Sequence, residues 1–371
     1  HMEKYTWHMG PKHGATTENT KKYIDFAAKH GFGGVLVEGW NYGWENNWTS
    51  EGHKFNFTTP YPDFDIEEIT QYGHSKGIGL IGHHETGGAT KNYEAQMEAA
   101  FALYNELGVH AVKTGYVSNR LDGKERHSSQ YGVRHNRKVI ETAAKYQIMV
   151  NIHEPVVQTG LRRTYPNLMA QEGVRGQEYN AWSPDGGNKP DHLTIIPFTR
   201  GLAGPIDFTP GIFNFENPVY PNTRVQTTLA KQLALYVTIY SPLQMAADLP
   251  ENYEGHPALK FIENVPVNWD VTKVLDAKIG DYITVVRKDR NSDEWFLGSI
   301  TDEQSRNMEY LLDFLDPNLT YTALIYRDGD NANWENNPTS IQIDEKKVTS
   351  GDVLNYRLAT SGGLAIRFIP E

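Results

Sequence analysis

The sequence predicts an α/β protein: a (β/α)8 TIM barrel followed by a small C-terminal antiparallel β-domain. The chain has 371 residues, which is enough for one barrel of about 250 residues and one smaller module. Up to about residue 265, short apolar runs alternate with amphipathic segments of helical length, as in a parallel sheet with crossover helices. Beyond Val265 the pattern changes to short alternating segments between turn residues. We therefore expect a barrel over 1–265 and a β-sandwich-like domain over 266–371.

Eight segments of the first part have the length and composition of barrel strands. They are Lys4 to Trp7, Gly34 to Glu38, Gly79 to His84, Ala111 to Thr114, Ile148 to His153, Val174 to Glu178, Ile206 to Thr209 and Pro242 to Ala247. Helices are expected between them, because apolar residues there recur every three or four positions. Those segments are Thr17 to His30, Ile66 to Lys76, Asn92 to Leu107, Val139 to Tyr146 and Thr227 to Tyr240.

Several residues mark where these helices begin and end. Thr16 or Thr17 before Glu18, and Asp65 before Glu67, are typical N-caps. Gly77 and Gly108 are typical of helix C-termini.

The last hundred residues predict strands without chemistry of their own. The expected strands are Tyr282 to Val286, Glu294 to Ser299, Asn307 to Leu311, Thr320 to Tyr326 and Ala365 to Ile369, with a turn at Asp328-Gly329. We interpret this module as a support domain.

Composition narrows the function classes. The formal net charge of −11 disfavours nucleic acid as a partner, since phosphate contacts need clustered Lys and Arg. No apolar run reaches the roughly 18 residues that span a bilayer. The chain has no cysteine, which excludes disulfides, thiolate metal sites and cysteine nucleophiles.

Aromatic residues make up 12% of the chain, which suits stacking on sugar rings and equally suits an aromatic core. His1-Met2 resembles a tag remnant, so we expect that the natural N-terminus and any signal peptide are absent.

Polar residues stand repeatedly at the expected strand ends, where barrel enzymes carry their chemistry. The first strands end in Glu38-Gly39-Trp40-Asn41 and His83-His84-Glu85, and the next run into Lys113-Thr114-Gly115-Tyr116 and His153-Glu154. Glu172, Glu178 and Asp207 follow. Four glutamates at one rim need a cation or protons to offset their repulsion, and Ca2+ accepts several carboxylates. The alternative is a structural ion network with Lys113, Arg162, Arg163 and Arg175.

Other chemistries are less well supported. His83 and His84 are adjacent on a strand and point to opposite faces, so they are not expected to share a zinc ion. Lys113 as a Schiff-base lysine is possible in principle, but a donor to sugar hydroxyls is the commoner role. The glycine-rich stretches lack a phosphate-loop pattern.

Seven stretches resemble glycoside hydrolase family 97, and within it the inverting α-glucosidase branch. They are Gly10-Pro11-Lys12-His13-Gly14-Ala15-Thr16-Thr17, Val37-Glu38-Gly39-Trp40-Asn41, Thr59-Pro60-Tyr61-Pro62-Asp63-Phe64-Asp65, His83-His84-Glu85-Thr86, Val112-Lys113-Thr114-Gly115-Tyr116-Val117, Arg163-Thr164-Tyr165-Pro166-Asn167 and Gly204-Pro205-Ile206-Asp207-Phe208-Thr209-Pro210-Gly211. Together they cover most of residues 5–250, and the resemblance continues more loosely into the β-domain.

The resemblance implies Ca2+-dependent release of terminal α-linked glucose from maltooligosaccharides with inversion. Glu178 would be the general acid, and Glu85 with Glu154 would activate the water. Glu154, Glu172 and Glu178 would be the metal ligands. The family's retaining branch has an Asp nucleophile where this chain has Gly115, and lacks the carboxylates found here at 85 and 154.

The substrate-binding residues expected at the same rim follow from strand-end position and chemistry. They are His83, Lys113, His153, Trp40 and Asn41.

The resemblance also implies a large N-terminal β-domain that contributes a calcium-ligating carboxylate and has no counterpart in these 371 residues. That domain is an expected partner, and the expected location is periplasmic or secreted. Two other functions stay open: a retaining α-galactosidase of the same family, and an inactive carbohydrate-binding barrel that lacks its N-terminal domain.

Overall fold

A computed structural model describes residues 5–371, and these form two compact units that divide between Gly173 and Val174. The tag-like His1-Met2 and the start of the first expected strand at Lys4 lie outside the described residues.

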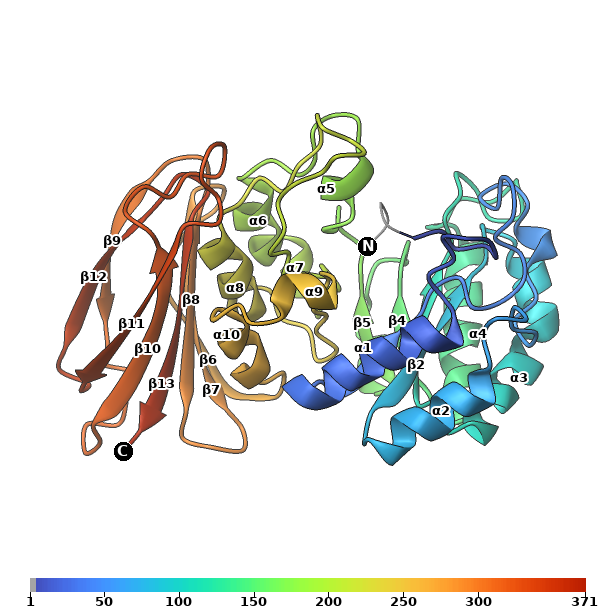
Figure 1. Ribbon diagram of the computed structural model, residues 1–371, viewed down its shortest axis with the longest axis horizontal. Coiled ribbons are helices and arrows are strands. Elements are labelled where there is room, and N and C mark those ends of the chain that lie inside the picture. The colour runs from blue at the N-terminus through green and yellow to red at the C-terminus, as the bar shows by residue number, and fades with distance from the viewer. Residues whose placement is uncertain (1–4) are drawn as a thin grey trace. The chain divides into compact units, whose positions relative to one another are not determined.

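The first unit is built on a five-stranded parallel sheet in the order β1-β2-β3-β4-β5 (Figure 1). Its strands are β1 Gly34–Leu36, β2 Gly79–Glu85, β3 Ala111–Gly115, β4 Met149–Ile152 and β5 Leu168–Gln171. Because sequence neighbours pair in parallel, their carboxyl ends lie at one edge of the sheet. The crossovers carry helices α1 Thr17–His30, α2 Ile66–Ser75, α3 Thr90–Glu106 and α4 Gln130–Lys145, and the 3₁₀ turns η1 Gly52–Lys54 and η2 Leu161–Arg163.

The expected helix ends are confirmed by their hydrogen bonds. The side chain of Thr16 accepts the N–H of Asn19, and that of Asp65 accepts the N–H of Glu68. Gly77 and Gly108 have positive φ angles of 74° and 69° directly after α2 and α3, which explains glycine at both positions. α4 begins nine residues before the expected Val139, because Ser129 caps it.

Four of the eight expected barrel strands are observed as β1 to β4, and the other four predictions are wrong in detail. Residues 174–178 are not a strand; the fifth strand is Leu168–Gln171 and ends before Gly173, whose φ is 59°. Within the part of the chain that the structure describes, residues 206–209 and 242–247 form no strand, although Ile206 is a bridge residue whose N–H donates to the carbonyl of Tyr240. In the described part of the first segment, Thr6 forms an isolated bridge with His13. Short apolar runs bounded by turn residues do not distinguish a strand from an extended buried loop.

The second unit combines short helices with antiparallel strands. The helices are α5 Tyr179–Trp182, α6 His192–Ile195, η3 Ile196–Phe198, α7 Arg200–Ala203, α8 Leu229–Thr238, α9 Pro250–Tyr253 and α10 Leu259–Asn264. The strands are β6 Trp269–Lys278, β7 Tyr282–Asp289, β8 Trp295–Thr301, β9 Arg306–Leu311, β10 Tyr321–Asp328, β11 Ile341–Val348, β12 Val353–Leu358 and β13 Gly363–Pro370. They form a six-stranded sheet, β11-β10-β13-β8-β7-β6, and a two-stranded one, β12-β9.

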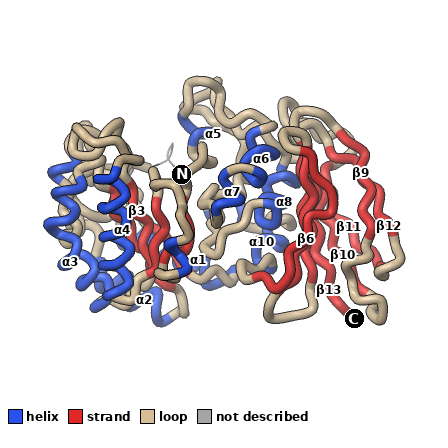
Figure 2. Tube along the Cα trace, turned by 180° about the vertical axis from the view of Figure 1, so that it is seen from behind, coloured by secondary structure: helices blue, strands red, loops and turns tan. Residues whose placement is uncertain are grey.

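Helix α8 is buried along its whole length and packs on the six-stranded sheet at β8 and β13 (Figure 2). Two glycines allow this close approach: a Cβ at Gly298 would lie 2.7 Å from the carbonyl oxygen of Ala234, and one at Gly363 would lie 2.5 Å from the Cα of Lys231. The Lys231 ammonium donates to the carbonyls of Pro190 and Thr301 and to the Ser361 hydroxyl. Helix α8 is thus part of the core of the C-terminal sheet.

A search of the described helices for a bilayer-spanning segment found none with the necessary length and apolar character. The domain boundary expected at 265/266 stays a prediction.

Candidate active site

The carboxyl ends of β2, β3 and β4 bring the expected site residues of the first unit side by side. In the paired register His83 lies opposite Lys113, and Glu85 lies opposite Gly115. The N–H of His153 donates to the carbonyl of Thr114, which continues this alignment one residue past β4. Adjacent parallel strands therefore place Glu85, Gly115 and the His153-Glu154 pair at one edge.

Glu85 is held rigidly in a buried position beside Gly115. Its Oε1 accepts backbone N–H groups from Thr86 at 2.9 Å, Gly87 at 2.7 Å and Val117 at 3.0 Å. A Cβ at position 115 would overlap the Oε2 atom of Glu85 and lie 3.0 Å from its carboxyl carbon. The carboxylate of Glu85 thus occupies the space that any side chain at position 115 would need.

Glu154 is the second carboxylate at this edge. Its Oε2 accepts the N–H of Tyr116 at 2.7 Å, and its backbone has a φ of 44°, which is uncommon for a residue other than glycine. Burial and the nearby Glu154 carboxylate raise the pKa of Glu85 to about 8. A buried carboxylate that lies near a second, partly buried one favours either a shared proton or a bound cation.

Glu38 ties together three groups at the same edge. Its carboxylate accepts from Lys113 Nζ at 2.6 Å and from Trp7 Nε1 at 3.3 Å, and it lies 3.5 Å from His83 Nε2. Although burial opposes ionisation, Lys113 and His83 hold the pKa of Glu38 well below its usual range. Sequence reasoning did not select Glu38 as a site residue, although its place at the end of β1 was a usable signal.

His83 and His84 have different surroundings, as expected for neighbours on one strand. The His83 ring stacks on Trp44 with centroids 5.7 Å apart, whereas His84 Nδ1 lies 2.9 Å from the Tyr93 hydroxyl and its ring stacks on Tyr104. Burial lowers the pKa of both imidazoles to about 3. Both rings are therefore neutral near pH 7.

Trp40 and Asn41 are buried, with relative exposures of 2% and 1%. The Trp40 indole N–H donates to the carbonyl of His83, and the Asn41 side chain donates to the carbonyl of Asn56 and accepts from Trp44 Nε1. These contacts support the backbone around His83. Their expected role in substrate binding stays a prediction.

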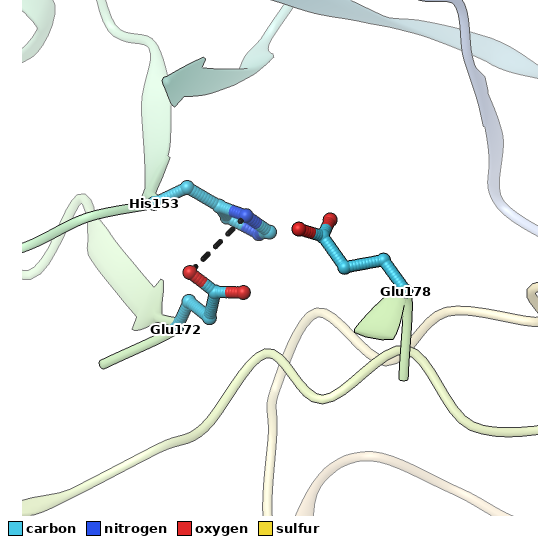
Figure 3. Close-up of side chains that lie close together, drawn as sticks. All are labelled: His153, Glu172 and Glu178. Atoms are coloured by element: carbon cyan, nitrogen blue, oxygen red, sulfur yellow. Dashed lines mark ion pairs between the residues drawn. The ribbon is translucent and has the colours of Figure 1, made fainter. Parts of the chain in front are cut away.

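His153 Nδ1 lies 3.6 Å from Oε2 of Glu172, and both side chains are buried (Figure 3). The two residues follow directly after β4 and β5, which pair in parallel. Glu178, the third residue labelled in Figure 3, belongs to the second unit, where it is the residue before α5. The expected metal ligands Glu154, Glu172 and Glu178 stay a prediction.

A parallel β/α unit with carboxylates at its strand ends, followed in the chain by an antiparallel β-domain, is typical of enzymes whose chemistry lies at the carboxyl ends of the strands. Two models of one family match the chain: glycoside hydrolase 97 over residues 1–174, and the glycosyl-hydrolase 97 C-terminal, oligomerisation region over residues 268–369. The chain belongs to glycoside hydrolase family 97.

Solved structures of the family are similar over the whole chain. A family 97 enzyme from Pseudoalteromonas sp. strain K8, in complex with acarbose, has 51% identity and a TM-score of 0.95, and the match covers 100% of this chain and 58% of that one. A variant of that enzyme in complex with panose has 50% identity and the same TM-score and coverage. This similarity confirms the predicted fold class, a TIM barrel followed by an antiparallel β-domain.

Two curated relatives have names that differ from the predicted activity. A retaining α-galactosidase of Bacteroides thetaiotaomicron is 31% identical over 95% of this chain, and a probable retaining α-galactosidase of Streptomyces bingchenggensis is 27% identical over 97%. The chain spans about half the length of each, 51%. The predicted family is therefore confirmed, and the predicted branch is not.

Proposed function

We propose that this chain carries the catalytic residues of an inverting glycoside hydrolase that releases terminal α-linked glucose from maltooligosaccharides. Family membership supports a glycosidase. The complexes of the Pseudoalteromonas enzymes with acarbose and panose support α-glucosidic oligosaccharides as the substrate class.

The observation that carries inversion is the contact between Glu85 and Gly115. A retaining glycosidase needs a nucleophilic carboxylate beside the anomeric carbon, whereas an inverting one needs room for a water and a base. In this chain a Cβ at position 115 would overlap the carboxylate of Glu85. An Asp nucleophile at 115 would require Glu85 to move away from three backbone donors.

The proposed reaction uses Glu178 as the acid and Glu85 with Glu154 as the base. The acid proton goes to the oxygen that leaves as the C1–O bond breaks. The base takes a proton from the water whose oxygen bonds to C1 on the opposite face. Glu85 is suited to this role because backbone donors hold its Oε1, while its Oε2 lies on the side of Gly115, where no side chain competes with it. His83, Lys113 and His153 are the proposed contacts of the terminal sugar.

A divalent cation fits the acidic character of this edge. Glu154 and Glu172 provide carboxylate oxygens, the ligands that Ca2+ prefers, and Glu178 is proposed to complete the set. His153 also offers a ring nitrogen. When bound, Ca2+ would offset the carboxylate repulsion and polarise the groups it contacts. The raised pKa of Glu85 favours a nearby cation as part of this proposal. A general base has to be deprotonated near neutral pH, and a cation would lower the pKa of this carboxyl.

The metal is tested by unfolding the protein at its natural length with Ca2+ or with a chelator. A free Ca2+ concentration of about 100 times Kd should raise the free energy of unfolding by about 2.7 kcal/mol. Glu172→Gln should reduce this gain, and an equal melting temperature with Ca2+ and with chelator would contradict the metal proposal.

Inversion is tested by following maltose hydrolysis by NMR and identifying the anomer that appears first. β-Glucose is the expected product, and α-glucose as the initial product would reject the proposal. Glu178→Gln and Glu85→Gln should each lower kcat by about 10²- to 10⁴-fold, the usual contribution of acid–base catalysis.

A retaining α-galactosidase is the second candidate, favoured by the names of the two curated relatives. Parallel assays with p-nitrophenyl α-glucoside and α-galactoside separate the two. Binding of an α-glucoside in calorimetry without turnover of either would favour a carbohydrate-binding barrel. A periplasmic or secreted location is proposed on the family resemblance alone.

A further inference from the structure

A buried chain of side-chain amides runs through the second unit and reaches the residue next to Glu178. Gln232 of α8 is fully buried, and its Oε1 accepts from Gln177 Nε2 at 2.7 Å. The Oε1 of Gln177 in turn accepts from Asn180 Nδ2 at 2.8 Å. The Oδ1 of Asn180 accepts the N–H of Asn188 at 2.6 Å. All four side chains are at most 5% exposed.

Hydrogen bonds from the same region also hold the backbone directly before Glu178. Asn188 Nδ2 donates to the carbonyl of Gly176 at 2.8 Å, and the N–H of Gln177 donates to the carbonyl of Phe208 at 3.0 Å. Gln232 Oε1 also accepts from the N–H groups of Gly211 and Ile212 at 2.9 and 3.2 Å. Residues 176–180 and the segment around 208–212 are thereby fixed to one point on α8.

Glu178 needs such support because its own helix is short. α5 contains four residues, and no side-chain hydrogen bond caps it. A single helical turn is unstable by itself, since nucleation costs more backbone entropy than one hydrogen bond returns. Buried hydrogen bonds from outside the turn are therefore what determines the backbone position of Glu178.

We propose that Gln177 and Gln232 are positioning residues that hold Glu178 where it protonates the leaving oxygen. This inference rests on the proposed function, in which Glu178 is the general acid. Neither amide has to touch the substrate. A shift of about 1 Å in an acid is enough to cost about a hundredfold in rate.

The test compares two substrates that differ in their need for an acid. Maltose loses a sugar oxygen that must be protonated as the bond breaks, whereas α-glucosyl fluoride loses fluoride, a much weaker base. In the protein at its natural length, Gln232→Met should lower kcat for maltose about ten- to a hundredfold, with KM within about twofold and turnover of α-glucosyl fluoride nearly unchanged. A merely structural role would lower both activities together.

Three further variants make the result decisive. Thr238→Val is the control. It removes a different buried polar group of α8, a hydroxyl that donates to the carbonyl of Ala234 in the same helix, and it should alter neither activity. Gln232→Glu keeps an acceptor oxygen for the three donors and should recover part of the maltose activity. Gln177→Met breaks one link of the chain, and replaces Gln232→Met as the test variant if the latter lacks a cooperative thermal transition.

Glu178→Gln separates failure of this inference from failure of the proposed function. If it loses maltose activity selectively but Gln232→Met and Gln177→Met do not, the positioning role is rejected and the acid is retained. If Glu178→Gln loses both activities equally, or neither, Glu178 is not the acid and both proposals fall.

Discussion

Gly115 is the residue on which the proposed inverting mechanism depends most directly. The sequence marks it as a strand-end glycine between Thr114 and Tyr116, and the structure shows that the carboxylate of Glu85 takes the space of its missing side chain. The choice between two mechanisms thus depends on one absent side chain and one glutamate on the neighbouring strand. Only the strand register, which sets Glu85 opposite Gly115, reveals that the Glu85 carboxylate leaves no room for a side chain at position 115.

Gly115→Ala is expected to displace Glu85 and to cost about 1–3 kcal/mol in the free energy of unfolding, as for other overpacked sites. Maltose turnover should fall at least tenfold, since the proposed base moves. Gly33→Ala is the matched control, because a Cβ at Gly33 meets no atom within 4 Å. Denaturant unfolding and initial rates measure both effects. The prediction is contradicted if the Gly115→Ala protein is as stable and as active as the Gly33→Ala protein.

The ion pair between Lys113 and Glu38 predicts a dependence of stability on pH. Because Lys113 helps to hold the pKa of Glu38 below its usual range, ionised Glu38 stabilises the fold above the pKa of the unfolded chain, near 4.5. That contribution falls as the pH drops below this value, since protons then bind the unfolded state more strongly.

Lys113→Met should therefore cost about 1–3 kcal/mol at pH 7, because it leaves the Glu38 carboxylate without its main partner. The difference from the unsubstituted protein should shrink between about pH 4.5 and 3. Urea unfolding at several pH values measures it. Lys145→Met is the control, since its ion pair with Glu98 is exposed and such pairs contribute little; a loss that is constant with pH would argue against the assignment.

At the scale of elements, helices were predicted better than strands. The 3.6-residue periodicity and cap residues identified α1 with its observed bounds and α2, α3 and α8 within two residues at each end. The sequence predicts a strand at 174–178 and misses Leu168–Gln171, because a strand of four residues carries too little pattern to be separated from an extended loop. Strand pairing depends on residues far apart in sequence, which local patterns do not contain.

The packing of α8 on β8 predicts a strong effect at Gly298. A side chain there would meet the carbonyl of Ala234 at 2.7 Å and the Cβ of Val237 at 2.8 Å, so the helix has to move away from the sheet. Gly298→Ala should lower the free energy of unfolding by about 1–3 kcal/mol. Gly351→Ala, where a Cβ would meet nothing within 4 Å, is the control, and equal melting temperatures for the two variants would show that α8 and β8 are not in close contact at Gly298.

For the whole molecule, the division into domains is the point on which sequence and packing differ most. The change of pattern at Val265 predicts a boundary there, and the family model of the C-terminal region begins at 268. Contacts within the second unit nevertheless join α8 to β8 and β13, and they bury Lys231 against Thr301 and Ser361. A boundary at 265/266 would separate α8 from the six-stranded sheet on which it packs.

A fragment of residues 174–371 is therefore expected to unfold cooperatively, whereas residues 266–371 alone should be less stable and should expose the sheet face that α8 covers. Thermal unfolding and binding of a hydrophobic dye to the two fragments measure the difference. Equal cooperativity and equal dye binding would support the boundary at 265/266.

The sequence by itself determined the family, the fold class, most helices and the strand-end glutamates, because these depend on local periodicity and on residue types at short spacing. The tertiary structure decided which strands exist, how Glu85 excludes a side chain at 115, and that Glu38 joins Lys113, His83 and Trp7. It also decided that the buried amide of Gln232 on α8 bonds to the side chain of Gln177, the residue before Glu178. These features are contacts between residues up to 75 positions apart, and only the paired register and the packed core bring such residues together.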